Sequence, residues 1–230
     1  MDFIFMLTRD DRTVRDCLRL VDGLAELRLA HIGFKDVGVD RGTLAALHSR
    51  IKAAGATSSL EVVSTSRERA LESARMAVDL GVDQLMGGVW VEETLELLSG
   101  TGIAYLPFPG APSGHPTRLG GTSGEVAEQC RRFEAAGCAG VDLLAYRATD
   151  ADPLELVRSA RAATTGRLVV AGSIDSPERI AALEAAGVDA FTVGSAAMTA
   201  SFDPRLGTLH GQLAAILSAA AGAHSERTSS

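Results

Sequence analysis

The sequence predicts an α/β protein that folds as a single (β/α)8 barrel, and three observations carry this prediction. The chain has 230 residues, a length that suits one barrel. Short apolar runs alternate with longer segments of helical period along the chain. The tripeptide Gly-Val-Asp recurs at Gly81, Gly140 and Gly187, where a helix gives way to the next strand. A glycine in the left-handed conformation closes a helix at such a place.

The elements follow in regular order. We expect strands near residues 2–8, 31–37, 59–64, 83–89, 103–107, 141–147, 167–172 and 189–194. We expect helices near residues 11–29, 42–54, 66–80, 91–99, 123–137, 153–165, 176–186 and 206–219. The seventh helix has the clearest start, because Ser176 can cap it, Pro177 suits its first turn and Glu178 suits its positive end.

This alternation favours a closed barrel over a doubly wound, flavodoxin-like sheet. Parallel strands with right-handed crossovers account for the order, and no Gly-rich nucleotide turn follows the first strand. We assign residues 1–218 to the barrel domain. Residues 219–230 turn small and polar, which predicts a disordered C-terminal tail.

Composition excludes several partners and groups. The formal charge of -7 disfavours nucleic acid and anionic membranes, and no run approaches the roughly 20 apolar residues that span a bilayer. We therefore expect a cytoplasmic protein. Cys17, Cys130 and Cys138 lack C-x-x-C spacing, so reduced thiols are expected. No metal-binding motif and no local signature of a nicotinamide or pyridoxal cofactor is present, so we expect no metal and no such cofactor. The sequence leaves open whether the chain forms a homo-oligomer.

Two strand ends carry a Gly-Ser pair. Strand seven ends at Gly172-Ser173 and strand eight at Gly194-Ser195. Barrel enzymes gather their chemistry at the C-terminal ends of the strands. Glycine lets an anion approach the backbone amides, both hydroxyls can donate, and a short helix near Ala196 would add free N–H groups. The two pairs therefore predict a phosphate site.

The segments 170–178 and 186–196 resemble the phosphate-binding (β/α)8 barrels. That superfamily includes the histidine-pathway ribosyl-phosphate isomerases, ribulose-phosphate epimerase, indole-glycerol-phosphate synthase and N-acetylmannosamine-6-phosphate epimerase. The resemblance covers about residues 166–198 and is architectural elsewhere. It implies a small phosphorylated substrate, often a sugar, and leaves the reaction open.

Three positions depart from these relatives. Ala171 stands where the N-acetylmannosamine-6-phosphate epimerases carry a catalytic Glu, and the third strand, 59–64, lacks their Lys. The resemblance therefore does not imply epimerisation by that route. For the acid expected at the end of strand one in the histidine-pathway isomerases, the chain offers only Asp10 or Asp11.

Lys35 is the leading catalytic candidate. The period of two in the second strand puts His31, Gly33 and Lys35 on one face, which faces the barrel interior if Ile32 and Phe34 meet the helices. The same rule turns Glu61 inward, so we expect an ion pair with Lys35. This pair either fills the barrel as a polar layer or acts in catalysis. Asp36 follows at the strand end, where it points toward substrate or bonds to a neighbouring loop.

Three further candidates lie after other strands. His115 stands in a loop rich in Pro and Gly after strand five and is a candidate acid or base. Arg147 ends strand six, where a guanidinium can bind a substrate carboxylate or a second phosphate. Gly88 ends strand four without a side chain and leaves room for a ligand, or marks a backbone bend.

Together these features predict an enzyme that acts on a small phosphorylated metabolite. An isomerase or epimerase that transfers a proton next to a carbonyl comes first. A lyase or aldolase that uses Lys35 as a Schiff base or an electrostatic catalyst comes second. A barrel that binds a phosphorylated ligand without catalysis is the alternative from another class.

Overall fold

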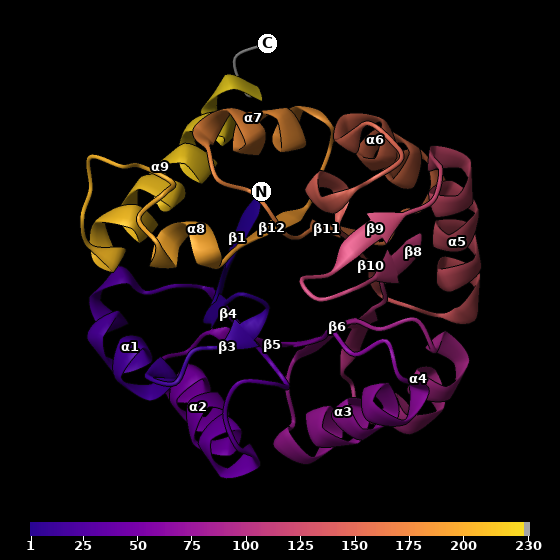
Figure 1. Cartoon of the computed structure of the whole chain (residues 1–230), viewed down its shortest axis with the longest axis horizontal. Coiled ribbons are helices and arrows are strands. Elements are labelled where there is room, and N and C mark those ends of the chain that lie inside the picture. Colours follow the sequence, from indigo (N-terminus) through magenta and orange to yellow (C-terminus); the bar gives the residue numbers. More distant parts are fainter. Residues whose placement is uncertain (228–230) are drawn as a thin grey trace.

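The computed structural model describes residues 1–227, and for residues 223–227 it describes the backbone alone. Eight parallel strands form a barrel in the order β10-β11-β12-β1-β4-β5-β6-β7 (Figure 1). Backbone hydrogen bonds from Ala139 N to Tyr105 O (2.9 Å) and from Asp142 N to Pro107 O (3.0 Å) close the ring. The strands are β1 (Asp2–Met6), β4 (His31–Lys35), β5 (Thr57–Val62), β6 (Gln84–Gly87), β7 (Ala104–Leu106), β10 (Gly140–Leu143), β11 (Arg167–Val170) and β12 (Ala190–Val193). The predicted fold class is confirmed.

Helices surround the strands as an outer ring (Figure 1). They are α1 (Cys17–Gly23), α2 (Arg41–Ala53), α3 (Arg67–Leu80), α4 (Val91–Leu98), α5 (Ser123–Ala136), α6 (Pro153–Ala163), α7 (Pro177–Ala185), α8 (Ser195–Met198) and α9 (Leu209–Arg227), with 3-10 turns at Ala25–Leu27 and Ala145–Arg147. The predicted start of α7 is present, since Ser176 accepts a hydrogen bond from Arg179 N and Pro177 occupies the first turn.

The structure departs from the predicted elements in four places. Strand β10 ends at Leu143, where the sequence predicts a strand to Arg147, and Ala145–Arg147 form a 3-10 turn instead. A short hairpin, β2 (Thr8–Arg9) and β3 (Arg12–Thr13), precedes α1, because Asp10 and Asp11 adopt positive φ and reverse the chain. A second hairpin, β8 (Ala111–Ser113) and β9 (Arg118–Gly120), occupies the loop after β7. Helix α9 continues to Arg227, where the sequence predicts a disordered tail from residue 219; residues 228–230 lie outside the described residues.

Apolar side chains pack in two layers. The larger layer lies between the sheet and the helices and includes Ile32 and Phe34. The smaller one fills the barrel itself and consists of Ile4, Met6, Met86, Leu106, Val169 and Ala190. The predicted faces of the second strand are therefore correct. Charged side chains cover this inner core at the end where the strands finish. Within the part of the chain that the structure describes, every helix is too short or too polar to cross a membrane.

Candidate functional site

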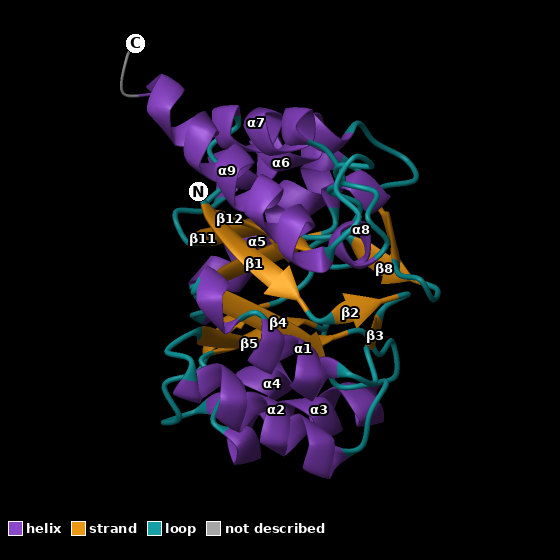
Figure 2. Ribbon diagram, turned by 90° about the vertical axis from the view of Figure 1, so that its left-hand side faces the viewer, coloured by secondary structure: helices purple, strands orange, loops and turns teal. Residues whose placement is uncertain are grey.

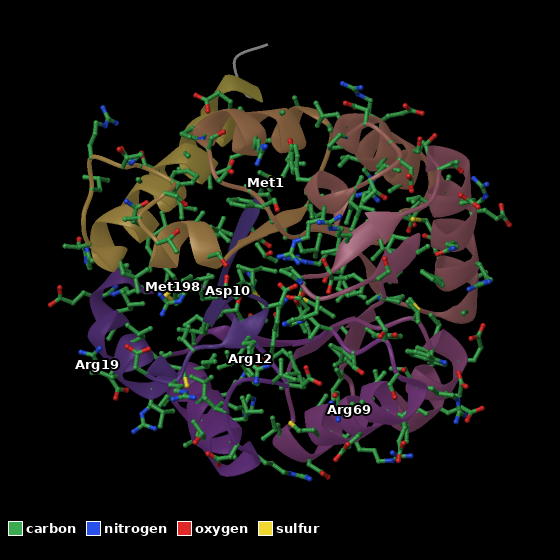
Figure 3. All side chains as sticks on the ribbon, viewed as in Figure 1. Met1, Asp10, Arg12, Arg19, Arg69 and Met198 are labelled. Atoms are coloured by element: carbon green, nitrogen blue, oxygen red, sulfur yellow. The ribbon has the colours of Figure 1, made fainter. Side chains whose placement is uncertain are left out.

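A pocket of about 700 Å3 opens at the C-terminal ends of the strands. Figure 2 shows that β2, β3, β8 and α8 gather at this end, toward which the arrow of β1 points. In Figure 3, Asp10 lies near the centre of the barrel mouth, whereas Arg19 and Arg69 lie on the outer ring. All four predicted phosphate residues line this pocket: Gly172, Ser173, Gly194 and Ser195.

The loops after β11 and β12 leave several backbone amides without a partner. Gly172 and Ser173 both adopt positive φ, of +79° and +56°, and so turn the chain sharply after β11. Ser195 and Ala196 begin α8, so their N–H groups have no acceptor within the helix. In residues 1–227, the amides of Ser173, Ile174, Ser195 and Ala196 donate to no protein acceptor, and all four residues line the pocket. The pocket thus presents four free donors from two neighbouring loops.

A buried charge cluster forms the floor of the same pocket. Lys35 Nζ donates to Asp11 Oδ1 at 2.8 Å and forms an ion pair with Glu61 Oε1 at 3.3 Å. Lys35 and Glu61 are each only 3% exposed and both line the pocket. The predicted ion pair is therefore present. From the sequence, Asp11 is predicted only as a possible replacement for the acid at the end of strand one. In the structure its carboxylate is the centre of this cluster.

Arg147 binds the other side of Asp11. Its Nη1 and Nη2 lie 2.7 Å from Oδ2 and 3.0 Å from Oδ1, an arrangement in which two donors meet one carboxylate. The amide of Thr117 adds a bond of 2.9 Å to Oδ2. Burial raises the pKa of Asp11, but the hydrogen bonds from Arg147 and the charge of Lys35 outweigh it and hold that pKa well below its ordinary value. Asp11 is therefore a fixed anion and a poor base.

Glu61 has more free lone pairs than Asp11 with which to accept a hydrogen bond or a proton. Within the described residues, its one polar partner is Lys35 at 3.3 Å, whereas both oxygens of Asp11 are fully engaged. A carboxylate with free lone pairs in a pocket can take a proton from a bound molecule. Of the two carboxylates beside Lys35, Glu61 is the better placed base.

Asp142 lies in β10, is fully buried and carries two oxygens that have no hydrogen-bond partner. Burial raises its pKa well above the ordinary value, and the charge of Glu61 raises it further, while Lys35 and Arg147 oppose this. Asp142 ends the second Gly-Val-Asp tripeptide, at residues 140–142, and is not among the site residues predicted from the sequence. The structure places it inside the barrel, within the electrostatic reach of the cluster.

Two predicted catalytic residues lie elsewhere. Asp36 accepts a short hydrogen bond from the hydroxyl of Ser73 in α3, so it faces the helix layer and does not line the pocket. The sequence left open a position toward substrate or a bond to a neighbouring loop; the structure shows neither, because the partner of Asp36 lies in helix α3. His115 is exposed in the turn of the β8–β9 hairpin, whereas its neighbours Pro116 and Thr117 line the pocket. Neither side chain lines the larger pocket or bonds to Lys35. We therefore no longer propose Asp36 or His115 as a catalytic residue.

Gly88 lines a separate pocket of about 230 Å3 and does not line the larger one. The predicted room for a ligand at Gly88 therefore belongs to the smaller pocket, and the positive φ of +72° at Gly88 is also the predicted backbone bend. Arg147 does line the main pocket, but Asp11 already binds its guanidinium. Arg118 also lines that pocket, is exposed and makes no ion pair within the described residues. No group of three or more His, Cys, Asp or Glu side chains that could hold a metal occurs in the described part of the chain.

Comparison with known proteins shows the fold, but it finds no family and no protein of similar sequence. No family model matches the chain, and no curated protein matches its sequence. Many solved structures do match. The native KDPGal structure has a TM-score of 0.66 and 13% identity, and the match covers 95% of this chain and 96% of that chain.

Two further structures give the same result. Orotidine 5'-phosphate decarboxylase from Pyrococcus horikoshii OT3 has a TM-score of 0.66 and 11% identity, over 95% of this chain and 98% of that chain. The N-acetylmannosamine-6-phosphate 2-epimerase from Clostridium perfringens has a TM-score of 0.62 and 12% identity, over 89% of this chain and 93% of that chain. At such identity the likeness shows the fold alone: the chain has the barrel architecture that these three structures share.

Proposed function

We propose that the chain is an enzyme that binds a small phosphorylated metabolite and transfers a proton next to its carbonyl group. One observation supports this most: four unpartnered amides and the Lys35 ammonium line a single pocket. Free amides in two adjacent loops suit a doubly charged phosphate group. A buried cation across the same pocket suits the negative charge that develops on a carbonyl oxygen.

In this proposal each group of residues in the pocket has its own role. The amides of the loops after β11 and β12 hold the phosphate, and the hydroxyls of Ser173 and Ser195 can add bonds to it. Glu61 takes the proton from the carbon beside the carbonyl, and Lys35 donates a hydrogen bond to the enolate oxygen that results. Glu61 then returns the proton to the neighbouring carbon while the proton of the adjacent hydroxyl group passes to the enolate oxygen, and this isomerises the substrate. Inversion of the first carbon instead requires a water molecule to deliver a proton to its opposite face. Asp11 and Arg147 fix Lys35 in place through their contacts.

A lyase or aldolase is the second candidate, because Lys35 could instead attack the carbonyl carbon as a neutral amine and form an imine with loss of water. That route requires the ammonium to lose a proton first. In the structure Lys35 acts as a donor to Asp11 and pairs with Glu61, which supports the electrostatic role over the imine. Borohydride treatment separates the two, since only an imine leaves a permanent adduct on Lys35.

Phosphate binding can be tested on the purified chain by thermal shift with inorganic phosphate, glycerol 3-phosphate and a panel of aldose and ketose phosphates. Ligands that bind the folded state raise Tm. The variant Ala196→Pro removes one free N–H at the second position of α8, where proline is tolerated. We expect its affinity for inorganic phosphate to fall about tenfold to a hundredfold, in line with one hydrogen bond to a charged group. No Tm rise with any phosphate compound would contradict the proposal.

The chemistry is tested by NMR in deuterium oxide on whichever panel compound raises Tm. Proton transfer next to the carbonyl replaces one carbon-bound proton with deuterium. The variants Lys35→Met and Glu61→Gln should each reduce this exchange by a factor of about 100 or more, the usual worth of a general base or an oxyanion donor, while phosphate binding persists. Binding without exchange in the unaltered chain would favour a barrel that binds its ligand without catalysis.

A further inference from the structure

The smaller pocket, of about 230 Å3, lies between the loops that follow β5, β6 and β7. Its walls are mostly apolar, with side chains of Val62, Val63, Val89, Trp90, Phe108 and Pro112. Ligand pockets that hold a whole small molecule usually measure about 300–1,000 Å3. The smaller pocket is therefore the right size for one part of a ligand, such as a single ring.

The smaller pocket adjoins the candidate active site. Thr117 lines both pockets, so one residue forms part of the wall between them. In β5, Glu61 lines the larger pocket and the next residue, Val62, lines the smaller one. The backbone of Thr117 is fixed, since its N–H donates to Asp11 and its C=O accepts from Arg147 at 3.2 Å. Because Glu61 and Val62 point to opposite faces of β5, a molecule that reacts at Glu61 would reach the apolar pocket over the C-terminal end of β5, beside Thr117.

Two glycines shape the wall of this pocket. Gly87 and Gly88 both adopt the left-handed conformation, with φ of +78° and +72°. A Cβ on Gly87 would lie 2.8 Å from the ring of Phe108, so only glycine lets the loop after β6 approach that ring. Val89, beside them, is 37% exposed, one of two large apolar side chains left exposed among the described residues. An apolar side chain at the edge of an apolar hollow suits contact with an apolar group.

We infer that the smaller pocket holds an aromatic ring of the same substrate whose phosphate group binds after β11 and β12. This inference rests on the proposed function. An aromatic ring is favoured over a sugar ring, because the walls offer Trp90 and Phe108, and aromatic rings pack well on one another. The substrate class is thus a phosphate monoester that carries an aromatic ring at the other end of a short chain.

The experiment uses a series of ω-phenylalkyl monophosphates with two to six methylene groups, compared with alkyl monophosphates of the same chain length. Affinity is measured by calorimetry. Trp90 is the single tryptophan of the chain, so its fluorescence reports on the smaller pocket. We expect at least one phenyl compound to bind about tenfold more tightly than its alkyl partner, the effect of burying one ring, and to change the Trp90 emission.

Matched variants test the place of binding. Val89→Asp puts a charge at the edge of the smaller pocket and should remove the tenfold preference for the phenyl compound while alkyl phosphate binding stays unchanged. Leu206→Asp is the control, since Leu206 is 36% exposed, nearly the same as Val89, and lines neither pocket. It should leave both affinities unchanged.

Three outcomes would overturn the inference. If alkyl phosphates bind and the phenyl group adds nothing at any length, the aromatic assignment fails and the phosphate site stands. If phenylalkyl alcohols change the Trp90 emission as strongly as the phosphates and do not compete with inorganic phosphate, the two pockets serve separate ligands. If no phosphate compound binds, the proposed function fails and the inference fails with it.

Discussion

Asp142 shows how charge is balanced inside the barrel. Three carboxyl groups, those of Asp11, Glu61 and Asp142, lie with two cations, Lys35 and Arg147. If Asp142 is protonated, two negative charges meet two positive ones. If it is ionised, the buried cluster carries an excess negative charge in a medium that penalises it. The raised pKa of Asp142 therefore keeps the interior neutral.

This balance predicts the effect of Asp142→Asn on stability. A carboxyl group whose pKa is raised in the folded state destabilises the fold as the pH rises above the unfolded-state value of 3.8, because folding then requires the uptake of a proton. Asparagine is neutral at every pH, so the variant should be more stable than the native chain at pH 7 and should lose this advantage near pH 4. A gain of about 1 kcal/mol would raise Tm by roughly 2–4 °C.

Asp11→Asn is the matched control, with the opposite sign. The pKa of Asp11 is lowered in the folded state, so its charge stabilises the fold above the unfolded-state value of 3.8, and this contribution is lost as the pH falls. The variant should be destabilised at pH 7 and should approach the native chain at low pH. Equal Tm changes for both variants at pH 7 would contradict the assigned charge states.

The sequence predicts Lys35 and Glu61 but not Asp142, and local strand boundaries explain the difference. Alternation along a strand is enough to turn Lys35 and Glu61 inward. The three Gly-Val-Asp tripeptides look alike, yet β6 begins at Gln84 and β12 at Ala190, after the aspartate, whereas β10 begins at Gly140. Asp142 is thus the third residue of its strand and points inside. Relative to the tripeptide, β10 starts three residues earlier than β6 and β12, and sequence patterns do not resolve such a shift.

At the scale of the element, the loop after β11 joins the amides proposed to bind phosphate to the charge cluster. A Cβ on Gly172 would overlap Nε of Arg147, so the arginine lies directly against the glycine backbone. Arg147 in turn binds Asp11 with both terminal nitrogens. The absence of a side chain at Gly172 therefore serves both the turn and the position of the guanidinium.

Gly172→Ala should consequently damage the pocket as well as the fold. Left-handed φ of +79° costs alanine about 1–2 kcal/mol, and the new methyl group displaces Arg147. We expect affinity for inorganic phosphate to fall by a factor of about 10 or more, because the loop and its amides shift. Calorimetric titration with phosphate, together with urea unfolding, measures both effects.

Gly187→Ala serves as the comparison. Its φ of +81° imposes a similar backbone cost, and its Cβ would meet only Arg161 carbons at 3.4 and 3.5 Å, an ordinary contact. Gly187 does not line the pocket. The free energy of unfolding should fall in both variants, more in Gly172→Ala because its methyl group also displaces Arg147, and phosphate affinity should fall only for Gly172→Ala. A loss of affinity in both would indicate that backbone strain alone is responsible.

The helices were predicted more closely than the connections. Helices α2 and α5 begin within one residue of the predicted start, because an N-cap side chain fixes each: Asp40 accepts from Thr43 N, and Thr122 from Glu125 N. The helix predicted from residue 11 begins only at Cys17, after the β2–β3 hairpin. Asp10 and Asp11 adopt the left-handed backbone conformation, which is uncommon for residues other than glycine. The sequence has no glycine there that would predict a turn.

At the scale of the whole molecule, the barrel has one weak seam. Strands β4 and β5 pair over five residues, from His31 opposite Thr57 to Lys35 opposite Glu61. Strands β7 and β10 meet through the two closing hydrogen bonds, from Ala139 N and Asp142 N. The ring is therefore held less extensively at this junction than between β4 and β5.

Hydrogen exchange should reveal this seam. Local opening needs less free energy where fewer bonds must break together, so the amides of Ala139 and Asp142 should exchange faster under native conditions than those of Ile32 and Phe34 in β4. A difference of about 1.4 kcal/mol in opening free energy corresponds to a factor of 10 in rate. Exchange followed by NMR measures each amide, and equal protection at both places would contradict the expectation.

The fold class itself was predictable because it depends on the whole pattern rather than on any boundary. Alternating strands and helices over 230 residues define a barrel even when single elements shift by several residues. The two Gly-Ser pairs were found by the same logic, since the ends of parallel strands share one face. His115 was misplaced because a loop rich in Pro and Gly does not specify its direction, and the hairpin turns this side chain to the outside.

The β8–β9 hairpin is tied to the charge cluster through main-chain atoms of Thr117, which Asp11 and Arg147 bind from either side. Main-chain groups are the same for almost every amino acid. The neighbouring side chains of the hairpin can therefore change in kind while the tie persists. A laboratory library confined to Pro116 and Arg118, which line the pocket, would vary what the pocket entrance recognises and leave the proposed proton-transfer residues in register, which makes this hairpin a natural starting point for altering substrate preference.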